Sequence, residues 1–568
     1  MNRRSTPPAK STDTPGPSLN LRAVHLVVLV AVSLVLLFLS FPPYVRGSGF
    51  PVWVALVPML VAARVAGYRR LALVSWVLGL GYGLASVFWL RHVGLFEGLA
   101  ALLSLSLYLS FYPPLFLMGW KLLDRRLGLP AAVTVPLLWV ALEYVKSFLL
   151  TGFPWFYLGH SLYRNLPLIQ IADLVGAYGV SVLVAAVNGL VADALWPALQ
   201  RGTLKEEYAR RRKGLVLSTG LVGAALIATL TYGTVRLRQV AVTEGPRVAL
   251  IQGNIPQSLK FKSVETERIL GIHRDLSLQA LAKNPDLIIW PETMLPGIFF
   301  SHEGYFATYN KTFDLDSSVR HLTAQLGRPL LAGARSESAS DDQFNSALLI
   351  TADGEVVSMY SKMHLVPFGE FVPRILRAPL RLLPDRLNPI PYRFGLEPGR
   401  AQTIFEVSPK DRPAAEPLRF GVLICYEDIM PYLARGLARR GVDCLVNITN
   451  DGWFKGSAEL DQHVIGSVFR AVETRKPVVR AANTGVTSII SPRGDEVARL
   501  RDPVTGSDRE VAGSLVHPVP LGPALAPTLY VRLGDLPVQV MTAAALLLLA
   551  FAGEKAWQER KTAKSDFF

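Results

Sequence analysis

The chain has 568 residues, of which 50% are apolar and 18% are charged. A soluble domain carries about 25% charged residues, so the composition excludes an ordinary soluble protein, and the abundance of apolar residues excludes intrinsic disorder. Two cysteines exclude a disulfide framework and a cysteine-rich metal site. The composition therefore predicts a membrane protein with a further domain attached.

Eight apolar stretches are candidates for membrane spans, since roughly 20 apolar residues cross a bilayer core of ~30 Å. The first follows Arg3, Arg4 and Arg22, but it is too long for the core of a signal peptide and lacks a small-residue cleavage site. We therefore predict that it is a retained span. The stretches are 23–41, 50–67, 71–90, 98–120, 129–147, 171–193, 214–234 and 537–553.

The distribution of Lys and Arg predicts the orientation in the membrane. Twenty of them lie at the two ends and in alternate loops (1–22, 64–70, 121–126, 194–213 and after 553), whereas the remaining short loops hold Arg46, Arg91 and Arg164. By the positive-inside rule, both termini are cytoplasmic. These segments also carry most of the formal net charge of +15, so we expect no nucleic-acid partner. The long insert after the seventh span then lies outside the cytoplasm.

This reasoning divides the chain into five parts. Three charged residues, Glu143, Lys146 and Asp173, lie near the ends of spans. A position at the membrane interface and a functional role are equally open for them. The parts are a basic cytoplasmic tail (1–22), a seven-span membrane domain (23–234), an extracytoplasmic domain (246–515), an eighth span (537–553) and a cytoplasmic tail (554–568).

The insert has the pattern of an α/β domain, because short apolar runs alternate with helical patterns. The strand-like runs are 247–253, 286–290, 329–334, 346–351, 419–425, 444–449 and 478–482, and the helical patterns are near 265–283, 316–326, 430–441 and 461–475. In such domains, polar residues that follow strands are the usual place for chemistry.

Three residues that follow strand-like runs form a set for acyl transfer. Glu292 follows DLIIWP, Lys362 follows the run 356–360, and Cys425 follows GVLI. Each residue alone has an ordinary explanation, such as a turn acid, a solvated lysine or a buried cysteine. Together, a thiol can attack a carbonyl, a carboxylate can take the thiol proton, and an ammonium can stabilise the oxyanion. Cys444, inside the run CLVNIT, is predicted to be a core residue.

Five motifs that include or accompany these residues together indicate a resemblance to a known family. The motifs are IQGNIPQSLKF, WPET, KMHLVPFGEFVP, CYEDI and NDGWF. Residues 246–515 resemble the nitrilase superfamily, whose Glu-Lys-Cys triad matches Glu292, Lys362 and Cys425. The eight spans, and Gly152-Phe153-Pro154-Trp155 after the fifth span, make the chain resemble the apolipoprotein N-acyltransferase family, the membrane-embedded branch of that superfamily.

The resemblance implies an αββα sandwich and a ping-pong reaction in the bacterial inner membrane, with a periplasmic catalytic domain. Cys425 would take the sn-1 acyl chain of a phospholipid, typically phosphatidylethanolamine, as a thioester. The α-amine of the diacylglyceryl-cysteine of an apolipoprotein would then accept the chain as an amide, the final step of lipoprotein maturation. No cofactor and no metal is implied.

The resemblance also implies residue roles. Glu292 would be the general base, and Lys362 would stabilise the oxyanion beside the Tyr426 N–H. Of the supporting residues, Glu370 would orient the triad, while Tyr426 and Glu427 would support the nucleophile loop. The residues implied at the substrate are Phe261, where the family often has Trp, together with Trp453 and Phe454.

Two alternatives remain open from the sequence. The first is a membrane-tethered amidase or nitrilase that acts on a small soluble substrate. The second is a transporter or receptor with a sensory nitrilase-like domain, which predicts a degraded triad, whereas all three positions are intact here. The proline-interrupted segment 371–400, which follows the Glu370 turn, is either a surface excursion or a membrane-facing lid over the acyl entrance.

Overall fold

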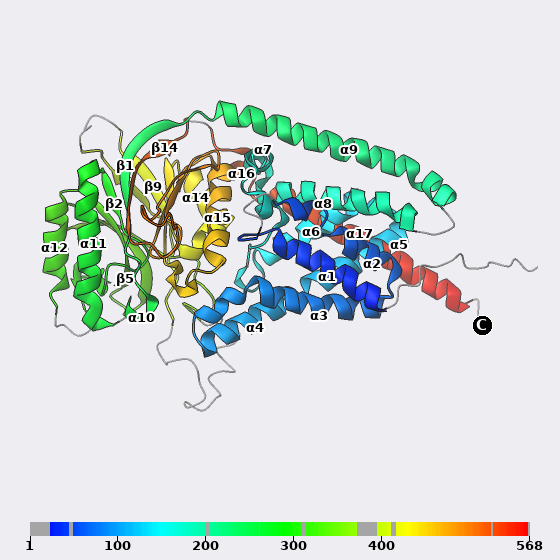
Figure 1. Cartoon of the computed structure of the whole chain (residues 1–568), viewed down its shortest axis with the longest axis horizontal. Helices are drawn as coiled ribbons and strands as arrows, with labels where there is room; N and C mark the ends of the chain where they lie inside the picture. Colours follow the sequence, from blue (N-terminus) through cyan, green and yellow to red (C-terminus); the bar gives the residue numbers. More distant parts are fainter. Residues whose placement is uncertain are drawn as a thin grey trace, which may run out of the picture.

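The computed structural model of the chain describes residues 23–44, 49–199, 204–260, 262–308, 313–371, 395–410, 416–523 and 526–565. Figure 1 shows a part built around β-sheets beside a part built of long helices, with α9 running along one side of the helices. Phe261 and most of the proposed lid, residues 372–394, lie outside the described residues.

The helical part places a helix at each of the eight predicted apolar stretches. Among the described residues, four helices are long and apolar enough to cross a membrane: Glu97–Leu127, Ala172–Leu199, Arg212–Gln239 and Leu536–Thr562. The helices are α1 (Ala23–Leu39), α2 (Val57–Val65), α3 (Tyr68–Ser86), α4 (Phe96–Ser110), α5 (Tyr112–Leu127), α6 (Ala131–Lys146), α7 (Leu166–Ile169), α8 (Ala172–Leu199), α9 (Leu204–Gln239) and α17 (Leu536–Ser565).

The other part contains two sheets. The first has the order β14-β1-β2-β5-β3-β4, with β6 paired to β5 and β7 paired to β6, and the second has the order β13-β12-β11-β10-β9-β8. The first-sheet strands are β1 (Thr243–Gln252), β2 (Leu287–Ile289), β3 (Ile298–Phe300), β4 (Tyr305–Ala307), β5 (Leu330–Glu337), β6 (Gln343–Ile350), β7 (Val356–Ser361) and β14 (Gly513–Leu521). The second-sheet strands are β8 (Ile404–Val407), β9 (Leu418–Ile424), β10 (Cys444–Thr449), β11 (Val478–Ala482), β12 (Ser488–Ile490) and β13 (Glu496–Arg499).

The two sheets and four helices form an αββα sandwich, as the resemblance implies. Apolar side chains of both sheets, such as Leu250, Leu349, Phe405 and Val446, make one core between them. The outer face of the first sheet packs on α11 (Thr266–Ala280) and α12 (Leu315–Leu326), and that of the second on α14 (Pro431–Arg439) and α15 (Glu459–Thr474). The central strands β2, β10 and β11 are therefore buried along their whole length, which accounts for their nearly continuous apolar sequences.

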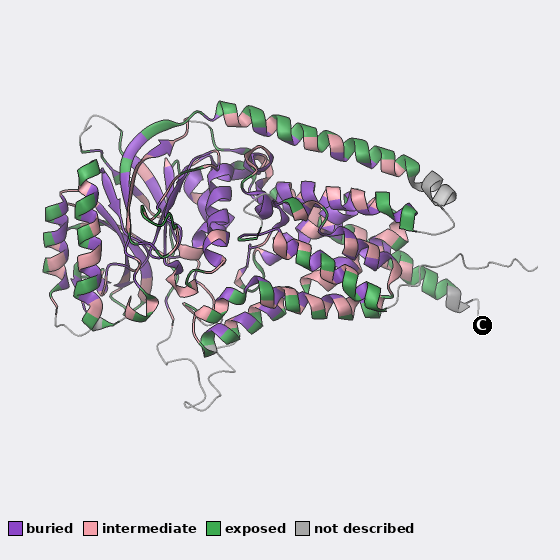
Figure 2. Ribbon diagram, viewed as in Figure 1, coloured by how far each residue is buried: buried purple, intermediate pink, exposed green. Residues whose placement is uncertain are grey.

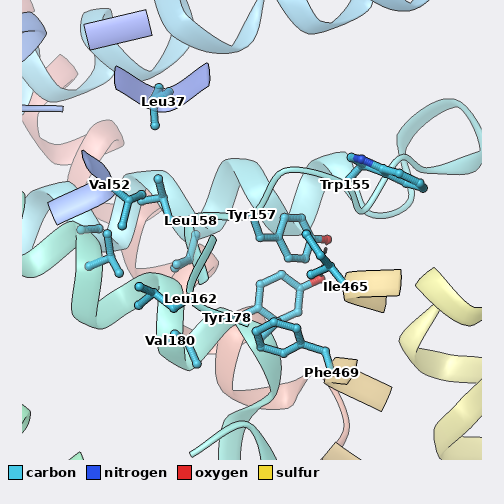
Figure 3. Packing of buried hydrophobic residues seen from close by; sticks show 14 of the residues in the cluster. Leu37, Val52, Trp155, Tyr157, Leu158, Leu162, Tyr178, Val180, Ile465 and Phe469 are labelled. Carbon is cyan, nitrogen blue, oxygen red and sulfur yellow. Dashed lines mark hydrogen bonds between the residues drawn. The ribbon is translucent and has the colours of Figure 1, made fainter. Parts of the chain in front are cut away.

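Helix α15 joins the two parts of the molecule. Figure 2 shows it almost entirely buried, in contrast to α9, and one core cluster runs from Ile465 and Phe469 of α15 into the helical part. Figure 3 shows Phe469 next to Tyr157 and Tyr178 of that part. Because α15 is buried on nearly all sides, its polar side chains are buried as well as its apolar ones. Buried polar side chains need hydrogen-bond partners.

Ion pairs also connect the two parts. Arg475, directly after α15, contacts the Asp173 carboxylate on α8 at 2.7 Å, and Arg435 of α14 contacts Asp535 at 2.7 Å. Asp173 therefore faces inward, into the junction between the two parts. Lys146 also points inward, since its Nζ donates to the Trp155 carbonyl oxygen at 2.7 Å.

Candidate active site

Three strand ends bring the predicted catalytic residues together. Strands β1, β2 and β5 are parallel, and β7 runs in the same direction as β5 because both are antiparallel to β6. Glu292 beyond β2 and Lys362 beyond β7 thus lie at one edge, with the Lys362 Nζ 3.6 Å from Glu292 Oε1. Cys425 follows β9 of the facing sheet, and its thiol is close enough to Glu292 and Lys362 for both charges to influence it.

The Glu292 carboxylate is held by two donors. Asn345 Nδ2 donates to Oε1 at 2.7 Å, and the Asn450 backbone N–H donates to Oε2 at 3.0 Å. Lys260 Nζ donates to the backbone oxygen of the same residue at 3.2 Å. Glu292 is only 6% exposed, so these contacts fix a buried carboxylate in one orientation.

Lys362 is kept charged by two carboxylates. Its Nζ lies 2.9 Å from a Glu370 oxygen in addition to its contact with Glu292. Burial alone favours the neutral amine, but Glu370 and Glu292 outweigh burial and raise the pKa of Lys362 above its ordinary value. Conversely, although burial favours its neutral form, the Lys362 ammonium lowers the pKa of Glu370. Glu370 also accepts from Asn345 at 3.0 Å, so it links the ammonium to the donor on Glu292.

Cys425 begins a 3-10 turn, Cys425–Ile429, and has a φ of 53°. A non-glycine residue keeps this left-handed conformation only when its surroundings hold it. Burial, reinforced by the Glu292 charge, raises the pKa of the Cys425 thiol well above its ordinary value. Cys425 is therefore a neutral thiol at rest, and as the predicted nucleophile it would need a base before it attacks.

Glu427 holds the nucleophile turn against the Lys362 loop. Its carboxylate accepts from the Ile424 N–H at 2.8 Å, from the Met363 N–H at 2.7 Å and from the Tyr360 hydroxyl at 2.8 Å. Burial raises the pKa of Glu427 to about 7 despite these donors. The side chain thus ties the Cys425 turn to the loop that follows Lys362.

The other predicted residues lie where the site meets the helical part. The Tyr426 hydroxyl donates to the Gly152 carbonyl oxygen at 3.0 Å, and its ring stacks at 6.5 Å on Trp155. Trp453 lies in the turn Asp451–Phe454, where the Phe454 ring packs edge-on against Trp89 at 4.8 Å. The position of Phe261 cannot be compared, as it lies outside the described residues.

Three residues beside the predicted triad also carry a sequence signal. Arg480 is a charged residue inside an otherwise apolar strand, Asn345 lies in β6 shortly before its apolar end, and a buried polar side chain must find a partner. Lys260, in the QSLK motif, also lies beside Glu292; burial lowers its pKa to about 8. These three residues surround or support the predicted triad.

One group of side chains in the described part of the chain has the spacing of a metal site. The oxygen and nitrogen atoms of Asp451, Glu459 and His463 lie within 4.8 Å of one another. However, Arg480 contacts the Asp451 carboxylate at 2.8 Å, and His463 lies 3.0 Å from both Asp428 and Asp451. The protein's own cations thus already neutralise these carboxylates, and the group has the character of a buried ion-pair network.

Two family models match most of the chain. A family model described as the apolipoprotein N-acyltransferase N-terminal domain matches residues 33–190, and one described as carbon-nitrogen hydrolase matches residues 247–506. An amidase structure from Nesterenkonia sp., 17% identical, covers 49% of this chain and 92% of the amidase with a TM-score of 0.33, a likeness that says nothing about function.

Two curated relatives are similar over most of their length. An apolipoprotein N-acyltransferase from Geobacter metallireducens is 37% identical over 482 residues, which is 82% of this chain and 85% of the relative. One from Rhodopseudomonas palustris is 31% identical over 522 residues, covering 88% of this chain and 89% of the relative. The chain belongs to the apolipoprotein N-acyltransferase family.

Proposed function

We propose that the chain transfers an acyl chain from the sn-1 position of a phospholipid to the α-amine of the N-terminal diacylglyceryl-cysteine of apolipoproteins. The observation that carries this proposal is the position of the nucleophile. Tyr426, next to Cys425, hydrogen-bonds through its hydroxyl to the Gly152 carbonyl oxygen, in the loop that follows α6 of the helical part. A thiol held against membrane helices can receive an acyl chain without exposing that chain to water.

In the first half-reaction, Glu292 takes the proton of the Cys425 thiol as the sulfur attacks the ester carbonyl carbon. The oxyanion that forms is stabilised by the Lys362 ammonium and the Tyr426 backbone N–H. When the intermediate collapses, the ester C–O bond breaks, and the lysophospholipid alkoxide takes the proton back from Glu292. The acyl chain remains on sulfur as a thioester.

In the second half-reaction, the neutral α-amine of the acceptor attacks the thioester carbonyl. Glu292 takes a proton from the attacking nitrogen, the C–S bond breaks, and the proton returns to the Cys425 sulfur. The products are an amide and the free thiol, so the cycle is balanced without a redox partner or cofactor. Lys362 stabilises the second oxyanion in the same position as the first.

The membrane arrangement is part of the same proposal. It comprises eight spans, cytoplasmic segments 1–22 and 554–568, a seven-span domain over 23–234, and a periplasmic catalytic domain over 246–515 in the bacterial inner membrane. The excess of Lys and Arg in the cytoplasmic segments supports this orientation. Phosphatidylethanolamine is the proposed donor, and Trp453, Phe454 and Phe261 are proposed to line the path of the substrates.

The proposal is tested with the full chain in detergent–lipid micelles. The substrates are phosphatidylethanolamine with a labelled sn-1 chain and a peptide that begins with diacylglyceryl-cysteine. We expect label to appear on the peptide as an amide, and we expect Cys425→Ala to abolish transfer, whereas Cys444→Ala transfers normally. Ammonia release from simple amides, without acyl transfer from phospholipid, would instead indicate a membrane-tethered amidase.

A further inference from the structure

A buried arginine lies between two loops of the active site. The Arg480 side chain, in the middle of β11, is 0% exposed and contacts Asp428 Oδ2 at 2.9 Å and Asp451 Oδ2 at 2.8 Å. Asp428 belongs to the turn that begins with Cys425, and Asp451 directly follows Asn450. One side chain thus connects the loop of the nucleophile to the loop whose backbone binds Glu292.

A short chain of hydrogen bonds leads from Arg480 to the nucleophile itself. Arg480 Nη1 donates to Asn447 Oδ1 at 2.5 Å, and Asn447 Nδ2 donates to the Cys425 carbonyl oxygen at 3.1 Å. The guanidinium fixes which way the Asn447 amide faces, because its N–H can only meet the amide oxygen. The amide nitrogen is then directed at the Leu423 carbonyl oxygen, at 3.0 Å, and at that of Cys425, whose left-handed backbone needs support from its surroundings.

A second chain leads from Arg480 to the general base. Asp451 is held by Arg480 and by the Thr449 hydroxyl, which donates to Oδ1 at 2.8 Å. The preceding residue, Asn450, donates its backbone N–H to Glu292 Oε2 at 3.0 Å. Arg480 thus holds the residue that directly follows this donor.

We propose that Arg480 is a positioning residue for acylation of the thiol: through Asn447 it orients the Cys425 backbone, and through Asp451 it places the Asn450 donor on Glu292. This role rests on the proposed function and adds to it the residue that aligns the nucleophile with the base. Proton transfer between them requires heavy atoms roughly 2.6–3.2 Å apart, so a small displacement of either loop slows the step.

Lysine is an informative replacement at this position. It retains the positive charge that Asp428 and Asp451 require. It lacks the planar guanidinium that contacts Asn447 and two carboxylates at the same time. Arg480→Lys therefore separates the loss of alignment from the loss of charge.

The matched control is Arg475→Lys. Arg475 is also buried and also pairs with an aspartate, Asp173 at 2.7 Å, but it lies at the junction with the helical part. Both variants disturb a buried Arg–Asp pair, so both are expected to lower the melting temperature. A third variant, Asn447→Ala, breaks the chain to Cys425 while leaving Arg480 between its two carboxylates.

The measurement is single-turnover formation of the acyl-enzyme from phosphatidylethanolamine micelles, followed by intact mass on the full chain. We expect Arg480→Lys and Asn447→Ala each to slow acylation by about 10- to 100-fold at saturating lipid. The lipid concentration at half-saturation should not change, since Arg480 does not contact substrate. Arg475→Lys should acylate at the wild-type rate. Arg480→Lys and Asn447→Ala interrupt the same chain of hydrogen bonds to Cys425. The double variant should therefore be no slower than the slower single variant.

A folded Arg480→Lys protein that acylates as fast as the wild type, or as fast as Arg475→Lys, would overturn the proposal. If Arg480→Lys does not fold, Asn447→Ala decides the matter: a wild-type acylation rate in that variant overturns the proposal as well. A wild-type protein that forms no acyl-enzyme would instead contradict the proposed function on which the role depends.

Discussion

The side chains of Cys425 and Lys362 are both buried, but neighbouring charges affect their protonation in different ways. Burial favours the neutral form of both the Cys425 thiol and the Lys362 amine. Two carboxylates keep Lys362 protonated and charged, whereas the Glu292 carboxylate acts with burial to keep Cys425 protonated and neutral. The resting site therefore contains a thiol and an ammonium, and a proton has to leave sulfur during the attack.

The state of the thiol predicts how Cys425 reacts with a small alkylating reagent. Because burial and Glu292 raise its pKa, the thiolate is a minor species at neutral pH. Alkylation by iodoacetamide should therefore be slow at pH 7 and should rise about tenfold per pH unit to pH 9, in proportion to the thiolate fraction. Mass spectrometry of the peptide that contains Cys425 measures the rate. A rate independent of pH over this range would mean that the resting thiol is already ionised.

The two cysteines are predicted to have opposite roles. Cys444 lies in β10 with 0% exposure, inside the core between the sheets, as its apolar sequence predicts. Cys444→Ala should lower the free energy of unfolding by about 1 kcal/mol and leave acyl transfer unchanged. Cys425→Ala should abolish transfer with little effect on stability. Melting temperature and transfer, measured on both variants, test the assignment, and loss of transfer in Cys444→Ala alone would reverse it.

The positions of Glu292, Lys362 and Cys425 after strands were predictable, because each follows a strand-like run, where a polar residue is conspicuous. Arg480 stands out only as a charged residue in VVRAA, a run that otherwise satisfies the pattern of a buried strand. Its partners, Asp428 and Asp451, come from turns after two other strands. Contacts between residues distant in sequence set its role, and periodicity does not reveal such contacts.

The strands position the predicted catalytic residues through close backbone packing. Gly333 in β5 passes directly beside the Glu292 turn, where a Cβ would come within 2.5 Å of the Pro291 oxygen and 2.6 Å of the Glu292 Cα. Only glycine allows this approach without a shift of the turn. The glycine thus helps to determine where the proposed base lies.

Gly333→Ala is therefore predicted to slow acylation of Cys425 by about tenfold or more, because the added methyl displaces the Glu292 turn. The comparison is Gly271→Ala in α11, where a Cβ meets no atom within 4 Å. The comparison variant should retain the wild-type rate and gain up to about 1 kcal/mol of stability from helix propensity. Equal acylation rates for the two variants would contradict the role of Gly333.

The major helices and strands of the sandwich follow from hydrophobic periodicity, but its edges do not. Strand β14 contains Pro518 and Pro520, which argue against a strand in the sequence. The prolines are tolerated because β14 is at the edge of the first sheet and pairs only with β1. The short strands β3, β4, β12 and β13 likewise depend on their neighbours and give little signal in three or four residues.

At the scale of the whole molecule, the catalytic part is fixed to the helical part by a core and by ion pairs. Helix α15 lies between the second sheet and the helices, and its last turn leads to Arg475. Arg475 contacts Asp173, which also accepts from Tyr232 at 2.7 Å and Arg236 at 2.9 Å of α9. This network holds α8, α9 and α15 together beside the active site.

Asp173→Ala should therefore destabilise the protein strongly, because it leaves the buried Arg475 guanidinium without its carboxylate. Removing one partner of a buried ion pair typically costs roughly 3–5 kcal/mol. The control is Asp275→Ala, whose pair with Arg274 is largely exposed, and which should change stability by less than about 0.5 kcal/mol. Thermal unfolding in detergent compares the two. Similar melting temperatures would show that the Asp173 network does not hold the two parts together.

The central claim is that Cys425 carries the acyl chain between two lipid substrates. It is tested most directly by the intact mass of the full chain after incubation with phosphatidylethanolamine, without an acceptor. We predict a mass increase of one acyl chain, located on Cys425, lost on addition of a diacylglyceryl-cysteine peptide and absent from Cys425→Ala. An unmodified wild-type protein that still transfers the chain, or an adduct that persists in Cys425→Ala, would contradict the thioester mechanism.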